Sequence, residues 1–138
     1  MQTFLPYASF ELSAAALDWK RLGKQRVEAK QILNALSGKS QGWVNHPATR
    51  MWRGYEPALR AYLRTCILEW ISRGYQNTME LPPLEPYAVP PWFGDPAFHA
   101  SHRSNLLRKD FEYYSKHGWQ EPADLPYVWP SQKELVIA

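Results

Sequence analysis

The stretch PALRAYLRTCILEWISRG, residues 57–74, decides the fold class. Seven of its apolar residues recur at the spacing of one helix face: Leu59, Tyr62, Leu63, Cys66, Ile67, Trp70 and Ile71. Pro57 suits the first turn of a helix, and Gly74 suits the position just after its end. The stretch therefore predicts a long amphipathic helix that packs one face into a core.

Four more helices are expected along the chain, over residues 13–19, 24–37, 47–53 and 96–116. Ser13 is the expected N-cap of the first, Gly23 is expected to precede the second, and Phe111 is expected to face the core in the last. Six prolines fall within residues 79–96, which predicts an extended strap between helices. No segment alternates as a strand would. We therefore expect an all-α single domain, residues 1–138, of about four to five helices with long Pro-rich connections.

Length and composition exclude several classes of protein. With 138 residues, 45% hydrophobic and 21% charged, the chain has the balance of one globular domain. No apolar run approaches the ~18 residues that span a membrane. The first residues lack the basic start and long apolar run of a secretory signal, and a single cysteine, Cys66, cannot form a disulfide framework. We expect a cytoplasmic protein with Cys66 in its core.

Positive charge is concentrated in one third of the chain. Residues 19–64 carry ten Lys and Arg against two Asp and Glu, while the whole chain has a net charge of only +3. Such a cluster is typical of a surface that binds nucleic acid. The predicted DNA-binding residues are Lys20, Arg21, Lys24, Lys30, Asn45, His46, Arg50, Trp52, Arg53, His99 and Arg103. For Trp52, stacking on an exposed base and burial in the core are both open at this point.

Glu28 stands out among these cations. It is the only carboxylate between Asp18 and Glu56, and Lys24 lies four residues before it, on the same helix face. A fixed negative charge opposes DNA binding, so it needs another reason to be there. One reason is chemistry, because an anion stabilises an oxocarbenium-like sugar or a protonated imine. The alternative is a simple salt bridge along the helix.

The second candidate for chemistry is the N-terminal amine. An α-amine has a pKa near 7.7–8.0, so at neutral pH far more of it is nucleophilic than of a lysine. The apolar residues that follow, Phe4 and Leu5 among them, are expected to anchor the chain start in the core. Because Gln2 is bulky for removal of the preceding residue, we expect Met1 to be retained and to carry the amine.

A metal site is a weaker hypothesis. His99 and His102 stand three residues apart, as metal ligands on a helix can. No Cys or Asp stands at matching spacing, so we expect no metal and no cofactor. A metal-dependent hydrolase built on His46, His99 and His102 remains as a minor alternative.

Three motifs, in order, resemble the pyrimidine-dimer DNA glycosylases of the endonuclease V type. These are the Arg26-Val27-Glu28 triplet, the run GKSQGWVNHP over residues 38–47, and EWISRGY over residues 69–75. The resemblance covers roughly residues 1–76. It implies a compact all-α fold, no cofactor, and attack of an N-terminal amine on C1′ of the damaged nucleotide followed by β-elimination. On this chain it gives the amine to Met1, the assisting carboxylate to Glu28 and a supporting role to Arg26.

The expected function is therefore a DNA glycosylase with AP-lyase activity. Its partner would be double-stranded DNA with a damaged or modified pyrimidine, and the enzyme would act as a monomer. The alternative from another class is a non-catalytic helical DNA-binding module that has this scaffold without the chemistry.

Overall fold

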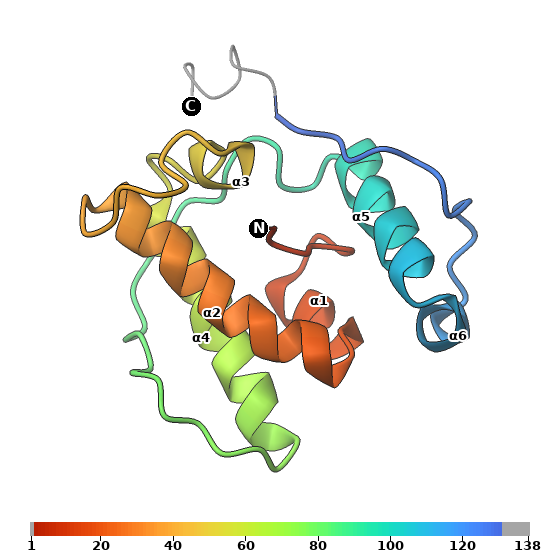
Figure 1. Ribbon diagram of the computed structural model, residues 1–138, viewed down its shortest axis with the longest axis horizontal. Coiled ribbons are helices and arrows are strands. Elements are labelled where there is room, and N and C mark those ends of the chain that lie inside the picture. Colours follow the sequence, from red (N-terminus) through yellow and green to blue (C-terminus); the bar gives the residue numbers. More distant parts are fainter. Residues whose placement is uncertain (1, 131–138) are drawn as a thin grey trace.

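A computed structural model describes residues 2–130, which form six α-helices, one short 3₁₀ helix and no strand (Figure 1). The helices are α1 (Phe10–Ala16), α2 (Trp19–Leu36), α3 (Pro47–Arg50), α4 (Glu56–Ser72), α5 (Pro96–Lys109) and α6 (Phe111–Tyr114), and the 3₁₀ helix is Ser115–His117. The predicted all-α fold class is confirmed. None of the helices in this described part combines the length and the apolarity that crossing a bilayer requires.

Helices α2 and α4 pack against each other and form the centre of the core. The apolar stripe predicted for residues 57–74 is buried from Leu59 to Ile67, but Ile71 is 45% exposed because it lies in the last turn of α4. Gly23 lies inside α2, which corrects the predicted helix start at residue 24. A Cβ at Gly23 would lie 3.1 Å from the ring of Trp70 on α4, so the missing side chain lets the two helices approach closely.

Two other predicted boundaries are wrong for local reasons. Helix α1 begins at Phe10 because Ser9, not Ser13, is its N-cap and accepts from the backbone N–H of Leu12 at 3.1 Å. The long helix predicted over residues 96–116 breaks at Asp110, which caps α6 by accepting from the backbone N–H of Tyr113. After this break Phe111 is 65% exposed instead of facing the core.

The predicted proline strap is confirmed as an extended segment after α4. Arg60 on α4 pairs with Glu85 at 2.8 Å, and Arg64 donates to the carbonyl oxygen of Pro82 at 2.6 Å. Tyr87 stacks on Phe10 of α1. These contacts fix the strap across α4 on the side away from the N-terminal segment (Figure 1).

The described start of the chain lies at the centre of the molecule, between α2, α3 and α5 (Figure 1). Residues 2–6 are all buried, although they form no helix or strand. Backbone groups buried in this way need hydrogen-bond partners, and side chains must supply them.

Candidate functional site

Side chains of α2 and α4 hold the first described residues. Gln25 is fully buried on α2; its Oε1 accepts from the backbone N–H of Phe4, and its Nε2 donates to the carbonyl oxygen of Gln2 at 2.7 Å. Tyr62 on α4 donates to the carbonyl oxygen of Phe4 at 2.8 Å. The chain start is thus fixed in position, as a catalytic group requires.

Glu28 holds the nitrogen at the very start of the described chain. The backbone N–H of Gln2 donates to Oε2 of Glu28 at 2.7 Å. Met1, predicted to carry the reactive amine, lies outside the described residues. The described residues show Glu28 at the nitrogen of Gln2, and the juxtaposition predicted for the Met1 amine stays a prediction.

A basic pocket of about 470 Å³ opens over this contact. It is lined by Gln2, Phe4, Lys20, Arg21, Lys24, Glu28, His46, Lys109, Tyr127 and Trp129. Four of the ten are Lys or Arg, which suits a phosphate backbone, and Glu28 faces the same space. Three of the predicted DNA-binding cations, Lys20, Arg21 and Lys24, meet here.

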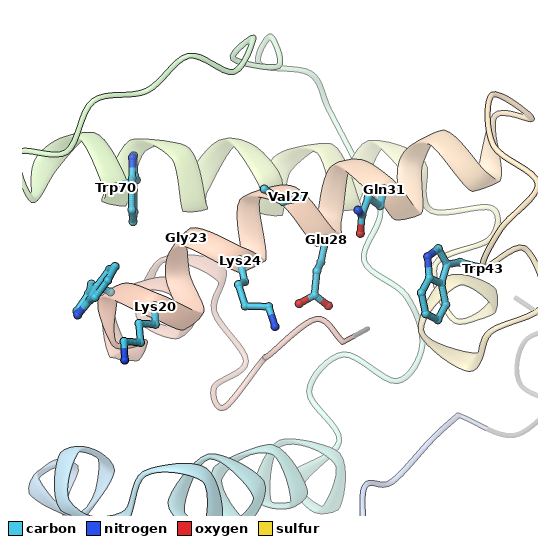
Figure 2. A pocket seen from close by; sticks show the side chains of 9 residues that line it. Lys20, Gly23, Lys24, Val27, Glu28, Gln31, Trp43 and Trp70 are labelled. Atoms are coloured by element: carbon cyan, nitrogen blue, oxygen red, sulfur yellow. The ribbon is translucent and has the colours of Figure 1, made fainter.

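An aromatic groove of about 510 Å³ runs along the other side of Glu28. It is lined by Trp19, Lys20, Gly23, Lys24, Val27, Glu28, Gln31, Trp43 and Trp70. Figure 2 shows Lys20, Lys24 and Glu28 projecting from α2 on the side of the N-terminal segment, with Trp43 at one end of the groove and Trp70 at the other. Glu28 lines both spaces, so a nucleotide in either could reach it.

His46 connects the loop before α3 to the basic pocket. Its Nδ1 caps α3 by accepting from the backbone N–H of Ala48 at 3.0 Å. Burial, and then the positive charge of the N-terminus, lower the pKa of His46, while Glu28 raises it. Trp43 and Trp129 each contact the His46 ring edge-on. His46 therefore lines the basic pocket as an imidazole that its cap on α3 holds in place.

The structure corrects two predicted DNA contacts. Trp52 is 0% exposed, and its indole N–H donates to the hydroxyl of Thr3 at 3.1 Å, so no base can stack on it. His99 is also buried, and both its ring nitrogens bond backbone groups of Leu5 and Gly94. Both residues hold the scaffold, because the chain start packs against them.

Two predicted arginines have structural contacts. The Arg26 guanidinium lies 4.1 Å from the ring centroid of Trp70 and donates to the side-chain oxygen of Asn77, and burial lowers its pKa. Arg26 lines neither of the two pockets that Glu28 lines, and its supporting role stays a prediction. Arg103 pairs with Glu121 at 2.8 Å and donates to the carbonyl oxygen of Pro6.

The remaining predicted contacts lie outside both spaces, on α2, on α3 and in the adjoining loops: Lys30, Asn45, Arg50 and Arg53. Lining residues that the sequence reasoning missed include Trp43, Lys109, Tyr127 and Trp129. Trp43 had a signal, since it stands between Gly42 and Asn45 in a loop rich in aromatic and amide groups. Nothing local marks the other three, which reach the pocket from the far half of the chain.

Within residues 2–130, no three His, Cys, Asp or Glu side chains come together as a metal site. His46, His99 and His102, the ligands of the hydrolase alternative, are not brought together. His46 caps α3, and the other two bond backbone groups of residue 5.

Comparison with known proteins matches the chain to a family of DNA glycosylases. The family model described as pyrimidine dimer DNA glycosylase matches residues 1–83, more than half of the chain. The matched region contains Gln2, Gln25 and Glu28 together with all of α1 to α4. No curated protein and no solved structure matches.

Proposed function

The chain belongs to the pyrimidine dimer DNA glycosylase family, and from this premise we propose that it removes a damaged or modified pyrimidine from double-stranded DNA and then cleaves the strand as an AP lyase. The N-terminal amine is the proposed nucleophile, and Glu28 is the proposed assisting carboxylate. The observation that supports this most strongly is the 2.7 Å contact between Oε2 of Glu28 and the backbone nitrogen of Gln2.

The contact bears on which residue carries the amine. If Met1 is retained, its amine precedes the Gln2 nitrogen by one residue. If Met1 is removed, the nitrogen beside Glu28 becomes the amine itself. The bonds of Gln2 to Gln25 and Glu28 support either form, because they tie the chain start to α2 before DNA binds.

The proposed reaction needs one nitrogen and one carboxylate. The neutral amine attacks C1′, a C–N bond forms, and the bond to the base breaks with its electrons leaving on the base. The nitrogen then loses a proton, and the C1′–O4′ bond breaks as O4′ takes up a proton. The product is a protonated imine, whose positive charge Glu28 stabilises. Removal of a proton from C2′ then expels the 3′ phosphate. Glu28 lies where it can accept protons from the nitrogen and from water.

The surroundings of Glu28 fit a nucleotide drawn out of a duplex. Lys20, Lys24 and Lys109 supply positive charge for the phosphates around the basic pocket. Trp43, which is half exposed, supplies a ring on which a base can stack at the end of the aromatic groove. The damaged strand would then pass over α2 with its sugar at Glu28.

The first test compares Glu28→Gln with Glu80→Gln, an exposed glutamate of the strap that lines neither space. Sodium borohydride reduces a protein–DNA imine to a stable adduct, which is measured on a duplex with one abasic site. We expect Glu28→Gln to slow adduct formation and strand cleavage by ~100-fold or more, as loss of a general acid–base group does, and Glu80→Gln to match the parent. Parental rates in Glu28→Gln would contradict the assignment of Glu28. Absence of both adduct and cleavage in the parent protein would instead favour a non-catalytic DNA-binding module.

A further inference from the structure

Two histidines of α5 bond both backbone groups of one residue in the chain start, Leu5. The backbone N–H of Leu5 donates to Nδ1 of His102 at 3.0 Å, and Nδ1 of His99 bonds the carbonyl oxygen of Leu5 at 2.7 Å. His99 and His102 stand three residues apart, so both rings face the same way from one helix. Leu5 itself is 0% exposed. The imidazoles thus replace the neighbouring strand that this extended backbone lacks.

The hydrogen bonds fix the proton on each ring. The backbone N–H of Gly94 donates to Nε2 of His99 at 2.9 Å, so the His99 proton is on Nδ1 and is donated to Leu5. In His102, Nδ1 accepts, so its proton is on Nε2. Each ring must therefore be neutral, and burial lowers the pKa of His102 to about 3. Both hydrogen bonds to Leu5 are therefore maintained throughout the neutral pH range.

The two hydrogen bonds at Leu5 bear on the N-terminal amine through the short backbone between residue 2 and residue 5. Leu5 follows Gln2 by three positions, and the intervening Phe4 is held by Gln25 and Tyr62. Helix α2 bonds the nitrogen of residue 2 and helix α5 bonds residue 5, so the segment is fixed from two sides. We propose that His99 and His102 are positioning residues which, through the backbone N–H and C=O of Leu5, set the place of the N-terminal amine beside Glu28. This inference rests on the proposed function, because it assigns the two histidines a part in that reaction.

The proposal differs from a purely structural role in what it predicts for related substitutions. His102→Leu removes the acceptor for the Leu5 N–H. His102→Asn keeps one, because an Asn oxygen can occupy nearly the place of Nδ1. Leu107→Ala, on the same helix, opens a cavity in the core and so lowers stability, without removing a bond to Leu5. It is the matched control for lost stability.

The first measurement is the rate of borohydride trapping on abasic duplex at saturating protein, with the dissociation constant measured in parallel. We expect His102→Leu to slow trapping at least ~10-fold, the effect of a slightly misplaced reacting group, with DNA affinity within ~2-fold of the parent. His102→Asn should recover most of the rate. Leu107→Ala should trap at the parental rate wherever it is folded. A slow Leu107→Ala, or His102→Asn as slow as His102→Leu, would overturn the proposal.

The second measurement does not depend on activity or on a large loss of stability. The N-terminal amine is ¹³C-methylated reductively and its pKa is read by NMR. In the parent background, Glu28→Gln should lower the amine pKa by about one unit, since a carboxylate favours the ammonium form. In the His99→Asn and His102→Asn backgrounds the effect should remain. In His102→Leu it should fall to less than half, because the amine has moved away from Glu28.

The two measurements separate this proposal from the proposed function. In one outcome, the effect of Glu28→Gln on the amine pKa is lost in His102→Leu, but the protein never traps DNA. That outcome would keep the positioning role and reject the glycosylase/lyase mechanism. In another outcome, trapping needs Glu28, but Glu28→Gln changes the amine pKa equally in all backgrounds. That outcome would keep the mechanism and reject the positioning role. Absence of any effect of Glu28→Gln on the amine pKa in the parent would also reject it.

Discussion

At the scale of single residues, Trp43 is held in a backbone conformation that a tryptophan rarely adopts. Its φ of 67° lies in the left-handed region, its side chain is 50% exposed, and its ring contacts that of His46 edge-on. Trp43 and Glu28 line the same groove. Such strain persists where function or packing maintains it. Half exposure argues against packing, and the position at the end of the aromatic groove argues for contact with a base.

We therefore expect Trp43→Gly to leave the free energy of unfolding within ~1 kcal/mol of the parent, because relief of the left-handed strain offsets the lost ring contact. DNA affinity should fall at least ~5-fold, since one stacked base is worth ~1–3 kcal/mol. Urea denaturation and fluorescence anisotropy with an abasic duplex measure the two effects. Trp52→Ala is the contrasting variant and should lose ~3–5 kcal/mol of stability. Unchanged DNA affinity in Trp43→Gly would remove Trp43 from the site.

Two tryptophans show what the sequence could predict at this scale. Trp52 was predicted to contact DNA but is buried, whereas Trp43 was not predicted and is half exposed in the aromatic groove. Glu28 was found because its charge opposes that of its neighbours in the sequence itself. The state of Trp52 depends on Thr3, which is far away in the chain and close in space. Local patterns reveal charge and helix faces, but burial in the middle of a molecule depends on the whole fold.

At the scale of elements, the contact between α5 and the chain start makes stability depend on pH. The pKa of His102 is about 3 in the folded protein, against an ordinary value of 6.5, because burial disfavours the imidazolium. The pKa of His99 is lowered for the same first reason. The unfolded chain therefore binds protons that the folded protein does not, and stability falls as pH falls through this range.

Between pH 6.5 and 5 we expect the free energy of unfolding to drop by up to ~1.4 kcal/mol per pH unit for each such histidine. Asp18 and Glu121, whose pKa values are lowered, stay ionised in this window and contribute no slope. Urea denaturation at a series of pH values measures the slope. His102→Asn should reduce the slope of the free energy of unfolding against pH, because the unfolded chain then lacks one titrating group. An unchanged slope in His102→Asn would mean that His102 does not titrate in this way.

Some helix starts could be predicted from local signals. Pro47 and the Asp95-Pro96 pair begin α3 and α5 as expected, because caps and proline act on their own first turn. The break at Asp110 has a local cause, its cap on α6, but the apolar pattern over residues 96–116 favours one continuous helix. The continuity of α2 through Gly23 could not be predicted, since it depends on Trp70 of another helix. Lys109 and Trp129 could not be predicted as lining residues for the same reason, because only the whole fold brings them to the basic pocket.

At the scale of the whole molecule, the basic pocket gathers cations from both halves of the chain around one carboxylate. Lys20 and Lys24 come from α2, whereas Lys109 ends α5. The positive cluster read from residues 19–64 is therefore only part of the predicted DNA-binding surface. Family membership and this charge distribution agree on DNA as the partner.

Affinity for duplex DNA should fall steeply with salt, because bound phosphates release counterions. Lys24→Ala and Lys109→Ala should each weaken binding and reduce the slope of log affinity against log salt by about 0.9, the value for one phosphate contact. Lys116→Ala is the control, since Lys116 lies over the ring of Tyr113 and lines neither space. Equal slopes in Lys109→Ala and the parent would exclude α5 from the interface.

The central claim is that the chain start and Glu28 act together on one sugar. The most direct measurement is borohydride trapping on an abasic duplex followed by mass-spectrometric mapping of the adduct. We predict one linked DNA fragment on the α-nitrogen of the N-terminal residue, whether that residue is Met1 or Gln2. An adduct on the side chain of Lys20 or Lys24, or no adduct while the strand is still cleaved, would contradict the account.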